Sequence, residues 1–325
     1  MLVRMEASPA TSAKPILTLT VNPALDVSTS TERVTSGHKL RCGTSRLDPG
    51  GGGVNVARVV QRLGGQTLAV YTAGGPTGDA YRRLIEAERI PTLAVPIQGS
   101  TRQDFTVDET DTGKQFRFVL QGPELSEEEW RAFLAVVAAS IPAGGFVVAS
   151  GSLPPGVPED FYARVARLSR EGGARCVVDA SGPALSAALA EGVFLIKPSL
   201  RELGEELGGA ALDTEPSQIG AISRLVAERS AEYVALTLGE AGAVLASKSG
   251  IIRIPVPAVR VISTVGAGDS FLGAFVLRLA QGHPVETAFR AAVAAGSATA
   301  MTPATELCHR DDVERLEAEL AAALL

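Results

Sequence analysis

The stretch Ser263-Thr264-Val265-Gly266-Ala267-Gly268-Asp269-Ser270 leads directly into an apolar run at residues 271–280. Two glycines allow the backbone to turn with its N–H groups converging on one point, and a helix over the apolar run would add its positive N-terminal end. Such a loop is a cradle for a multiply charged anion, for example a phosphate. Asp269 lies inside it, where a carboxylate can take a proton from a substrate. The stretch therefore favours phosphoryl transfer.

Other meanings of this glycine loop have to be weighed. A tight strand-to-helix turn needs glycines for geometry alone, and a lone G-x-G is equally typical of such a turn. The dinucleotide-binding fingerprint has its third glycine where this chain has Phe271, which weakens that interpretation. No stretch matches the P-loop pattern, because Gly113-Lys114 is followed by Gln115. If the protein uses ATP, it does so without a P-loop.

Composition and charge narrow the function classes. The chain has 325 residues, 46% hydrophobic and 20% charged, which is typical of a soluble globular protein. Its net charge of -6 argues against a general nucleic-acid binder, and no run reaches the roughly 18 apolar residues that span a membrane. Three widely spaced cysteines fit a reducing compartment, so we expect a cytoplasmic protein. Residues 1–14 lack an apolar secretory core and are predicted to be a loose extension.

Short apolar runs alternate with helical patterns along most of the chain. The predicted strands are 16–21, 67–71, 146–149, 175–178, 194–196 and 233–238, with a hairpin from 244–246 and 251–256. The predicted helices are 54–63, 77–88, 159–170, 183–190, 200–207, 218–228, 271–281, 285–300 and 311–324. This alternation predicts an α/β fold with a mainly parallel sheet flanked by helices on both faces. In such a sheet ligands bind beyond the carboxyl ends of the strands, and the glycine-rich loops all fall there.

Two segments interrupt the alternation. Residues 27–47 and 103–119 are β-like and polar, with no helix between their strands, and residues 115–119 alternate polar with apolar side chains. We expect them to pair into a small sheet outside the main body, as a lid over an active site or as a contact between two copies. Residues 15–325 are otherwise predicted to form one domain.

A second glycine loop, residues 50–53, opens the predicted helix at 54–63. Four glycines let the backbone approach a ligand closely, and Asn55 offers both a donor and an acceptor. A flexible turn is the alternative, but four consecutive glycines are then costly in chain entropy. Asp26 follows the first strand, where its carboxylate can accept hydrogen bonds from two sugar hydroxyls. Taken alone, Asp26 is better explained as an exposed turn residue.

Charged residues near these loops also have two interpretations each. Lys39, Arg41 and Arg102 lie in or beside the predicted lid and are ordinary surface charges unless they converge. If they do, they would bind a second phosphate that is not transferred. Glu202 could hold Mg²⁺ or act only as an acid in the first turn of a helix. Residues 237–243 could wrap a nucleotide or form a hairpin turn.

These stretches together resemble the ribokinase-like (PfkB) family of carbohydrate kinases. The resemblance extends from Leu17 to about Arg315 and is carried by the two glycine loops at 50–58 and 265–270. Further matching strings are Lys39-Leu40-Arg41-Cys42, Thr101-Arg102-Gln103, Gln115-Phe116-Arg117-Phe118-Val119 and Ser150-Gly151-Ser152-Leu153-Pro154-Pro155-Gly156-Val157. Within the family the chain is most similar to the minor, phosphofructokinase-2 type of bacterial 6-phosphofructokinase. The resemblance implies a three-layer fold, with a central sheet between helices and a small β-sheet lid.

The resemblance also implies an activity, ATP-dependent phosphorylation of a phosphosugar, with fructose 6-phosphate as the first expectation. Asp269 would be the base, and the anion hole would consist of Gly266, Ala267, Gly268 and Asp269. The sugar would be held by Asp26, Gly51, Gly52 and Asn55, and its phosphate by Lys39, Arg41, Arg102 and Ser152. ATP would be held by Lys197, Ser199, Thr237, Gly239, Gly242, Gly266 and Gly268, and Mg²⁺ by Glu202. A K⁺ site, if present, would use Ser263, Val265, Thr299, Thr302 and Ala304. Members of the family are commonly homodimers joined through their lid sheets.

Some positions depart from the family's pattern. Ser199 stands where the family has Asn in Asn-x-x-Glu, which weakens the expected hold on magnesium-bound water. Ser263 replaces a frequent acid, and Pro303 changes a loop that relatives fill with Asn or Gly, so dependence on K⁺ stays open. 1-Phosphofructokinases and tagatose-6-phosphate kinases share much of the frame. A kinase for an unphosphorylated sugar or nucleoside would leave the three lid cations in solvent, and a sugar-phosphate sensor on a kinase scaffold is the non-enzyme alternative.

Overall fold

The computed structural model describes residues 13–323, and a nine-stranded sheet lies at its centre. Its strands, in order across the sheet, are β13 (Gly250–Ile254), β12 (Ala243–Ser247), β11 (Ala231–Thr237), β10 (Val193–Ile196), β9 (Arg175–Asp179), β8 (Phe146–Ser150), β1 (Ile16–Thr20), β4 (Leu68–Ala73) and β5 (Thr92–Pro96). Neighbours from β11 to β5 pair in parallel, whereas β12 and β13 add an antiparallel hairpin. The carboxyl ends of seven strands therefore meet at one edge of the sheet.

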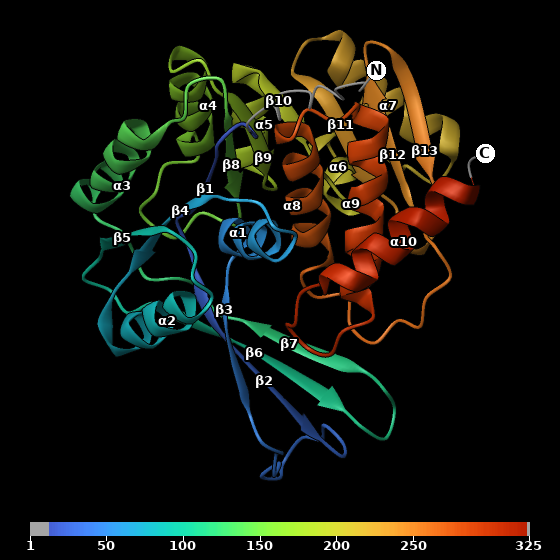
Figure 1. The fold of residues 1–325 in the computed structure, drawn as a ribbon. Coiled ribbons are helices and arrows are strands. Elements are labelled where there is room, and N and C mark those ends of the chain that lie inside the picture. The colour runs from blue at the N-terminus through green and yellow to red at the C-terminus, as the bar shows by residue number, and fades with distance from the viewer. Residues whose placement is uncertain (1–12, 324–325) are drawn as a thin grey trace, which may run out of the picture.

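Helices cover both faces of this sheet (Figure 1). One face packs against α1 (Gly52–Arg62), α8 (Ala267–Ala280), α9 (Val285–Ala300) and α10 (Arg310–Ala323). The other packs against α3 (Glu127–Ser140), α4 (Phe161–Glu171), α5 (Pro183–Glu191), α6 (Leu200–Glu206) and α7 (Glu215–Ala227). Helix α2 (Gly75–Ala87) packs beside β4, and the short 3-10 turn η1 (Gly239–Ala241) joins β11 to β12. None of the helices described between residues 13 and 323 is long and apolar enough to cross a membrane.

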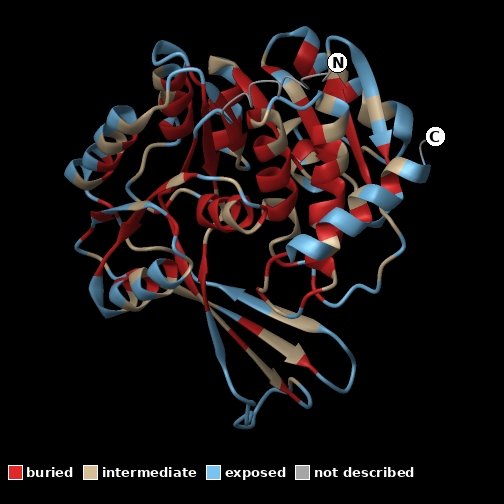
Figure 2. Ribbon diagram, viewed as in Figure 1, coloured by how far each residue is buried: buried red, intermediate tan, exposed pale blue. Residues whose placement is uncertain are grey.

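The central strands carry near-continuous apolar side chains because helices bury both of their faces. Leu17 and Val147 point to the α3–α7 side, while their neighbours Ile16 and Val148 point to the α8–α10 side. Figure 2 shows these strands as buried along their length. The strands are therefore held rigidly by packing on both faces, and the polar loops lie at the ends of the strands.

A separate four-stranded sheet lies at the bottom of Figure 1, in the order β3 (Arg46–Gly50), β2 (Ala24–Thr31), β6 (Arg102–Glu109) and β7 (Gln115–Val119). Its strand register defines two rows of side chains. The inner row, which faces the main body, is Asp48, Asp26, Asp104 and Val119; the outer row, on the opposite face, is Leu47, Val27, Phe105 and Phe118. Asp26 thus lies inside a strand, not in the turn that the sequence suggests.

The small sheet is fastened to the loop that follows α9. Thr305 Oγ1 donates to Asp48 Oδ2 over 2.7 Å and lies 3.2 Å from Ser28 Oγ, so it joins β2 and β3. Arg46 Nη1 forms an ion pair with Glu306 Oε2 over 2.6 Å. The position of this sheet therefore depends on residues far along the chain.

The sequence prediction is confirmed for the α/β class, for the mainly parallel sheet between two helical layers and for the small separate sheet. Strand β5 and helix α3 are absent from the prediction. The start of α3 has a recognisable signal, because Ser126 and Glu129 form a capping box that bonds each side chain to the other's backbone. The predicted extension at 1–14 lies almost wholly outside the described residues.

The four glycines at 50–53 form a shorter turn than the sequence suggests. Strand β3 ends at Gly50 and α1 begins at Gly52, so Gly51 alone, with φ of 113°, lies between them. A Cβ on Gly52 would lie 2.1 Å from Ser150 Oγ, and one on Gly53 would lie 2.2 Å from Leu19 O. Close packing against β1 and β8, and not a flexible loop, explains these glycines.

This packing predicts opposite effects for two helical glycines. Gly53→Ala should lower the free energy of unfolding by about 1–3 kcal/mol, because the new methyl group overlaps a backbone carbonyl that cannot move freely. Gly220→Ala, in α7, meets no atom within 4 Å and should raise it by about 0.5–1 kcal/mol. Urea unfolding of both variants checks this, and a Gly53→Ala protein as stable as the wild type would contradict it.

Candidate active site

A cavity of about 540 Å³ lies between the carboxyl ends of the parallel strands and the inner row of the small sheet. Residues from the sequence prediction that line it are Asp26, Gly51, Gly52, Asn55, Arg102, Ser152, Glu202, Val265, Gly266 and Asp269. Charged and polar residues that the prediction did not include also line it, among them Asp104, Arg117, Ser150, Glu159 and Asp179. Loops from both ends of the chain therefore meet in one space.

Asp269 lies in the first turn of α8 and is held by Asn55 of α1. Asn55 Nδ2 donates to Asp269 Oδ2 over 2.8 Å. Burial and, to a smaller extent, the charge of Asp179 raise the pKa of Asp269 to about 6, against the effect of the Asn55 hydrogen bond and of Lys197. A carboxyl group with a pKa close to the working pH can serve as a general base.

The orientation of Asn55 depends in turn on a buried arginine. Arg58 Nη1 donates to Asn55 Oδ1 and to Pro49 O, each over 3.3 Å. Arg58 also forms ion pairs with Glu88 (2.9 Å) and Asp48 (3.4 Å), so its buried charge is compensated. Because Arg58 occupies the amide oxygen of Asn55, the amide nitrogen is left to face Asp269.

Glycines shape the loop that precedes α8. Gly266 adopts φ of 78°, in the left-handed region, and a Cβ there would lie 2.6 Å from Leu307 Cδ2. A Cβ on Gly268 would lie 3.1 Å from Lys197 Nζ. Both positions therefore favour glycine, one for its backbone angle and the other for the close approach of a cation.

The N–H groups of this loop are not equally available. Ala267 N donates to Thr264 O over 3.3 Å, and the hydrogen bond from Ser270 N to Gly266 O begins the helix. Gly268 precedes Ser270 in the first turn of α8, where backbone N–H groups have no acceptor within the helix. Gly268 is thus better placed than Ala267 to donate to an anion at the positive end of α8.

Lys197 follows β10 and is buried beside Asp179 at the end of β9, with 3.3 Å between Nζ and Oδ1. Burial disfavours its charge, but Asp179, Asp269 and Glu202 together hold the pKa of Lys197 above its usual value. Burial disfavours the charge of Asp179 as well, which raises the pKa of this carboxyl group, and the charge of Lys197 opposes that rise. The lysine therefore supplies a fixed positive charge beside the glycine loop that precedes α8, near Gly268.

The small sheet adds two carboxylates and two arginines to the cavity. Burial and the neighbouring Asp104 raise the pKa of Asp26 to about 7, against the effect of Arg117 and Arg102. Burial also raises the pKa of Asp104, which forms an ion pair with Arg102 over 3.1 Å. Asp26 lies against Gly50, where a Cβ would come within 2.2 Å of Asp26 Oδ2. The lid side of the cavity is thus charged and closely packed.

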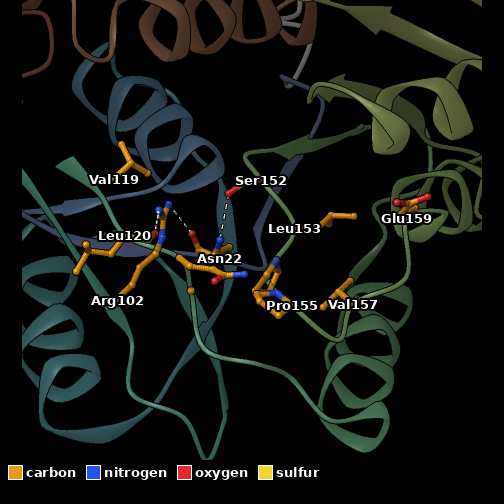
Figure 3. Close-up of a pocket in the computed structure, with 12 residues that line it drawn as sticks. Asn22, Arg102, Val119, Leu120, Ser152, Leu153, Pro155, Val157 and Glu159 are labelled. Carbon is orange, nitrogen blue, oxygen red and sulfur yellow. Dashed lines mark hydrogen bonds between the residues drawn. The ribbon is translucent and has the colours of Figure 1, made fainter. Parts of the chain in front are cut away.

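Arg102 also lines a second cavity of about 530 Å³, which shares Val119, Ser152, Leu153 and Glu159 with the first. Figure 3 shows Arg102 at its wall, joined by hydrogen bonds to Leu120 O (2.9 Å) and Asn22 O (3.3 Å). Asn22 Nδ2 donates to Ser152 Oγ over 3.1 Å. Arg102 and Ser152, both predicted to bind a phosphate, therefore lie at the wall common to the two cavities.

Apart from Gly266 and Gly268 at the start of α8, the residues predicted to bind ATP lie near the ends of β10 and β11. Ser199 pairs with Thr237 across these strands, and Gly239 and Gly242 form the η1 turn that follows. Glu202 N donates to Ser199 Oγ over 3.3 Å and Ser199 N donates to Glu202 Oε2 over 2.8 Å, which makes a capping box at the start of α6. Ser199 Oγ also donates to Glu202 Oε2 over 2.8 Å. The position where the family has Asn is thus used to cap a helix. Among residues 13–323, no three His, Cys, Asp or Glu side chains form a group that could hold a metal ion.

The residues predicted for K⁺ lie in two touching loops behind the anion loop. Ser263 Oγ donates to Ala304 O over 2.9 Å, and Thr302 Oγ1 donates to Thr299 O over 2.7 Å. Ala304 has φ of 53°, which is rare for alanine and turns its carbonyl group toward this region of the chain. Val265 N–H also contacts Ser263 Oγ (3.3 Å). Hydroxyl and carbonyl oxygens are gathered here.

Lys39 and Arg41 are not part of either cavity. Both are exposed and lie on the loop at 32–45 that joins β2 to β3. Of the three lid cations, only Arg102 reaches the cavity of its own chain. The structure therefore separates these cations into one at the site and two on the lid surface.

Sequence reasoning missed Asp104, Arg117 and Asp179. Arg117 belongs to the alternating strand at 115–119, in which every second residue faces the body, so that pattern could have indicated it. Asp179 ends a predicted strand, in the place where ligand-binding side chains are expected. Asp104 carries no local signal, because its role depends on which residues the neighbouring strands place beside it.

Comparison with known proteins agrees with this geometry. Residues 21–311 match the family described as "pfkB family carbohydrate kinase". The chain is 45% identical over 307 residues to the ATP-dependent 6-phosphofructokinase isozyme 2 of Mycobacterium tuberculosis, which covers 94% of this chain and 90% of that one. It is 33% identical to the 1-phosphofructokinase of Bacillus subtilis over 95% of this chain and 100% of that one.

Solved structures agree as well. Phosphofructokinase-2 from Escherichia coli in complex with potassium has a TM-score of 0.91, 39% identity and coverage of 95% of this chain and 99% of that one. The same enzyme in complex with fructose-6-phosphate has a TM-score of 0.89, 38% identity and the same coverage. With a family match over residues 21–311 and relatives up to 45% identical over most of its length, the chain belongs to the pfkB family of carbohydrate kinases.

Proposed function

We propose that the protein transfers the γ-phosphoryl group of ATP to the 1-hydroxyl of fructose 6-phosphate. The observation that carries this proposal is the arrangement of Asp269 and Arg102 around one cavity, with a base beside the anion loop and a cation on the lid side. The names of the relatives and the fructose-6-phosphate complex of the Escherichia coli enzyme support the choice of substrate. Arg102 also counts against a kinase for an unphosphorylated sugar, which would leave it in solvent.

The proposed chemistry is an in-line transfer. Asp269 takes the proton of the attacking hydroxyl while that oxygen forms a bond to the γ-phosphorus and the bond to the β-phosphate oxygen breaks, releasing ADP. Gly268 N–H, the positive end of α8 and Lys197 stabilise the charge that develops on the phosphoryl oxygens. Asp26 and Asn55 hold the sugar hydroxyls so that the reacting oxygen faces the base.

Two cations fit the residues present. Glu202 keeps Oε1 outside its capping box, and we propose that it holds Mg²⁺ through water, since Mg²⁺ usually takes few protein ligands and several phosphate oxygens. Mg²⁺ would neutralise charge on the phosphates of ATP. The oxygens gathered by Ser263, Val265, Thr299, Thr302 and Ala304 suit K⁺, and the potassium complex of the Escherichia coli enzyme supports that proposal.

Turnover on a panel of acceptors tests the proposed substrate. The panel is fructose 6-phosphate, fructose 1-phosphate, tagatose 6-phosphate, ribose and adenosine, each with ATP and Mg²⁺, with ADP release measured. We expect the highest kcat/KM for fructose 6-phosphate. A preference for fructose 1-phosphate or tagatose 6-phosphate would replace the substrate and keep the reaction, whereas turnover on none of the five would favour a sensor.

Removal of the base gives a second test. Asp269→Asn keeps the size of the side chain but cannot accept a proton, so kcat should fall by about 10²–10⁴-fold, the usual contribution of a general base. Asp213→Asn, which removes the same charge from an exposed loop, should leave kcat unchanged. An Asp269→Asn variant that turns over at nearly the wild-type rate would exclude Asp269 as the base.

The raised pKa of Asp269 predicts the pH dependence of the reaction. The base must be deprotonated, so kcat/KM should fall as the pH drops below about 6, by roughly tenfold for each unit. The Asn55 hydrogen bond lowers this pKa, so in Asn55→Ala the acid limb should move to higher pH. Steady-state rates from about pH 5 to about pH 9 measure both profiles. A limb at the same pH in both proteins would contradict the assignment to Asp269.

We also propose that two copies join through the outer row of the lid sheet. Leu47, Phe105 and Phe118 are 45%, 37% and 51% exposed and form a continuous apolar strip across adjacent strands. A strip of this kind is the usual mark of an interface, and a two-fold pairing would cover it on both copies. Because Lys39 and Arg41 lie outside the cavity of their own copy, we assign them to the phosphate of the sugar bound by the partner.

Sedimentation of surface variants tests the dimer. Phe118→Asp should give a monomer, because it places a charge in the strip that the partner would bury. Leu93→Asp, on β5 and 42% exposed, makes the same change outside the lid and should leave the dimer intact. A wild-type protein that sediments as a monomer at micromolar concentration would rule out this interface.

A further inference from the structure

The guanidinium group of Arg102 is already engaged before any substrate is considered. Its Nη1 atom forms an ion pair with Asp104 Oδ2 over 3.1 Å and also lies 3.2 Å from Oδ1. The charged groups of both side chains are mostly buried, with 11% and 16% of the side chains exposed. The cation that the proposed function assigns to the sugar phosphate is therefore neutralised by a carboxylate two residues away on the same strand.

Arg102 does not need Asp104 to keep its position. Two backbone carbonyl groups also hold it, Leu120 O at 2.9 Å from Nη1 and Asn22 O at 3.3 Å from Nη2 (Figure 3). Asn22 is held by its hydrogen bond to Ser152 Oγ over 3.1 Å, and Leu120 by the bond from its N–H to Asp104 Oδ1 over 2.9 Å, which an uncharged amide oxygen can also accept. Removal of the Asp104 charge should thus leave the guanidinium group in place and free its charge.

The surroundings of Asp104 make its charge unfavourable for a phosphate. Asp104 lies beside Asp26 in the inner row, and both carboxylates line the cavity with Arg102. A phosphate dianion that reaches Arg102 meets the carboxylate of Asp104, which contacts the same guanidinium group, and repulsion between the two is only weakly screened there. Arg117 supplies the other positive charge on this side of the cavity.

We propose that Asp104 competes with the phosphate of the sugar for Arg102 and thereby weakens the binding of the phosphorylated substrate. This inference rests on the proposed function, since it takes Arg102 as the phosphate ligand. Asp104 has no part in proton transfer, so its effect is confined to substrate affinity. The chain thus carries an internal anion that limits how tightly its own substrate binds.

Asp104→Asn is the matched variant. The Asn side chain has the same size, and its Oδ1 can still accept the hydrogen bond that Leu120 N donates to Asp104 over 2.9 Å, so the β6 edge is retained. Asp111→Asn removes the same charge from the exposed turn between β6 and β7 and serves as the control. Arg102→Ala identifies the phosphate ligand itself.

The experiment measures steady-state kinetics of the full-length wild type and the three variants with fructose 6-phosphate as the varied substrate. In Asp104→Asn, KM for fructose 6-phosphate should fall by about three- to tenfold, the effect of freeing one partly buried charge, with KM for ATP unchanged. Asp111→Asn should match the wild type, and Arg102→Ala should raise KM for the sugar. An unchanged KM in Asp104→Asn would overturn the proposal, and a raised KM would show that Asp104 positions Arg102 instead.

A second measurement separates this inference from the proposed function. Thermal stabilisation by inorganic phosphate needs no turnover, and it should reach half its maximum at a lower phosphate concentration in Asp104→Asn than in the wild type. If the wild type turns over none of the phosphosugars, the proposed function fails, and the phosphate titration then decides the role of Asp104. Equal titrations in that case would overturn the competition as well.

Discussion

The active site depends on how closely α1 approaches α8. A Cβ on Gly273 of α8 would lie 2.9 Å from Val59 Cβ and 3.1 Å from Val56 O, so no other residue allows this approach without a shift of the helices. At the ends of the same two helices, Asn55 and Asp269 come within hydrogen-bond distance, although 214 residues separate them. The glycines at 52 and 53 bring α1 equally close to β1 and β8. The close approach that these glycines allow thus sets the distance between Asn55 and Asp269, the proposed base.

The site gathers carboxylates although its proposed substrates are anions. Burial raises the pKa of Asp26, Asp104, Asp179 and Asp269, so the folded protein holds protons that the unfolded chain has released. These groups therefore reduce stability as the pH rises above about 4, and the loss continues up to their pKa values in the folded state. Lys197 and Arg102 offset part of this charge, and bound cations would offset more. The buried carboxylates proposed to serve the reaction thus lower the free energy of unfolding.

The sequence predicts the layers of the fold well because buried strands and amphipathic helices have strong periodic patterns. Strand β5 is missed because it is short and ends in Pro96, and α3 because its capping box at Ser126 precedes only a moderately apolar face. At the site, glycine loops mark the proposed base and the proposed anion hole. Cross-strand neighbours such as Asp26 and Asp104 leave no local mark, since strand register alone brings them together. The roles of Lys39 and Arg41 on the lid loop depend, in the proposed dimer, on a partner, which one chain does not display.

The helices that complete one face of the central sheet are synthesised after every strand of that sheet. Ile16, Phe146 and Val177 are covered by α8, α9 and α10, and the loop that fastens the lid, with Thr305 and Glu306, belongs to the same final segment. While the ribosome still holds that segment, the nascent chain carries a sheet with one apolar face covered only by α1, a form prone to aggregation and to capture by chaperones. Burial of this face, attachment of the small sheet and placement of Asp269 are thus completed only when this segment has been synthesised. A prematurely terminated chain would lack the proposed catalytic base and would be exposed to proteolysis.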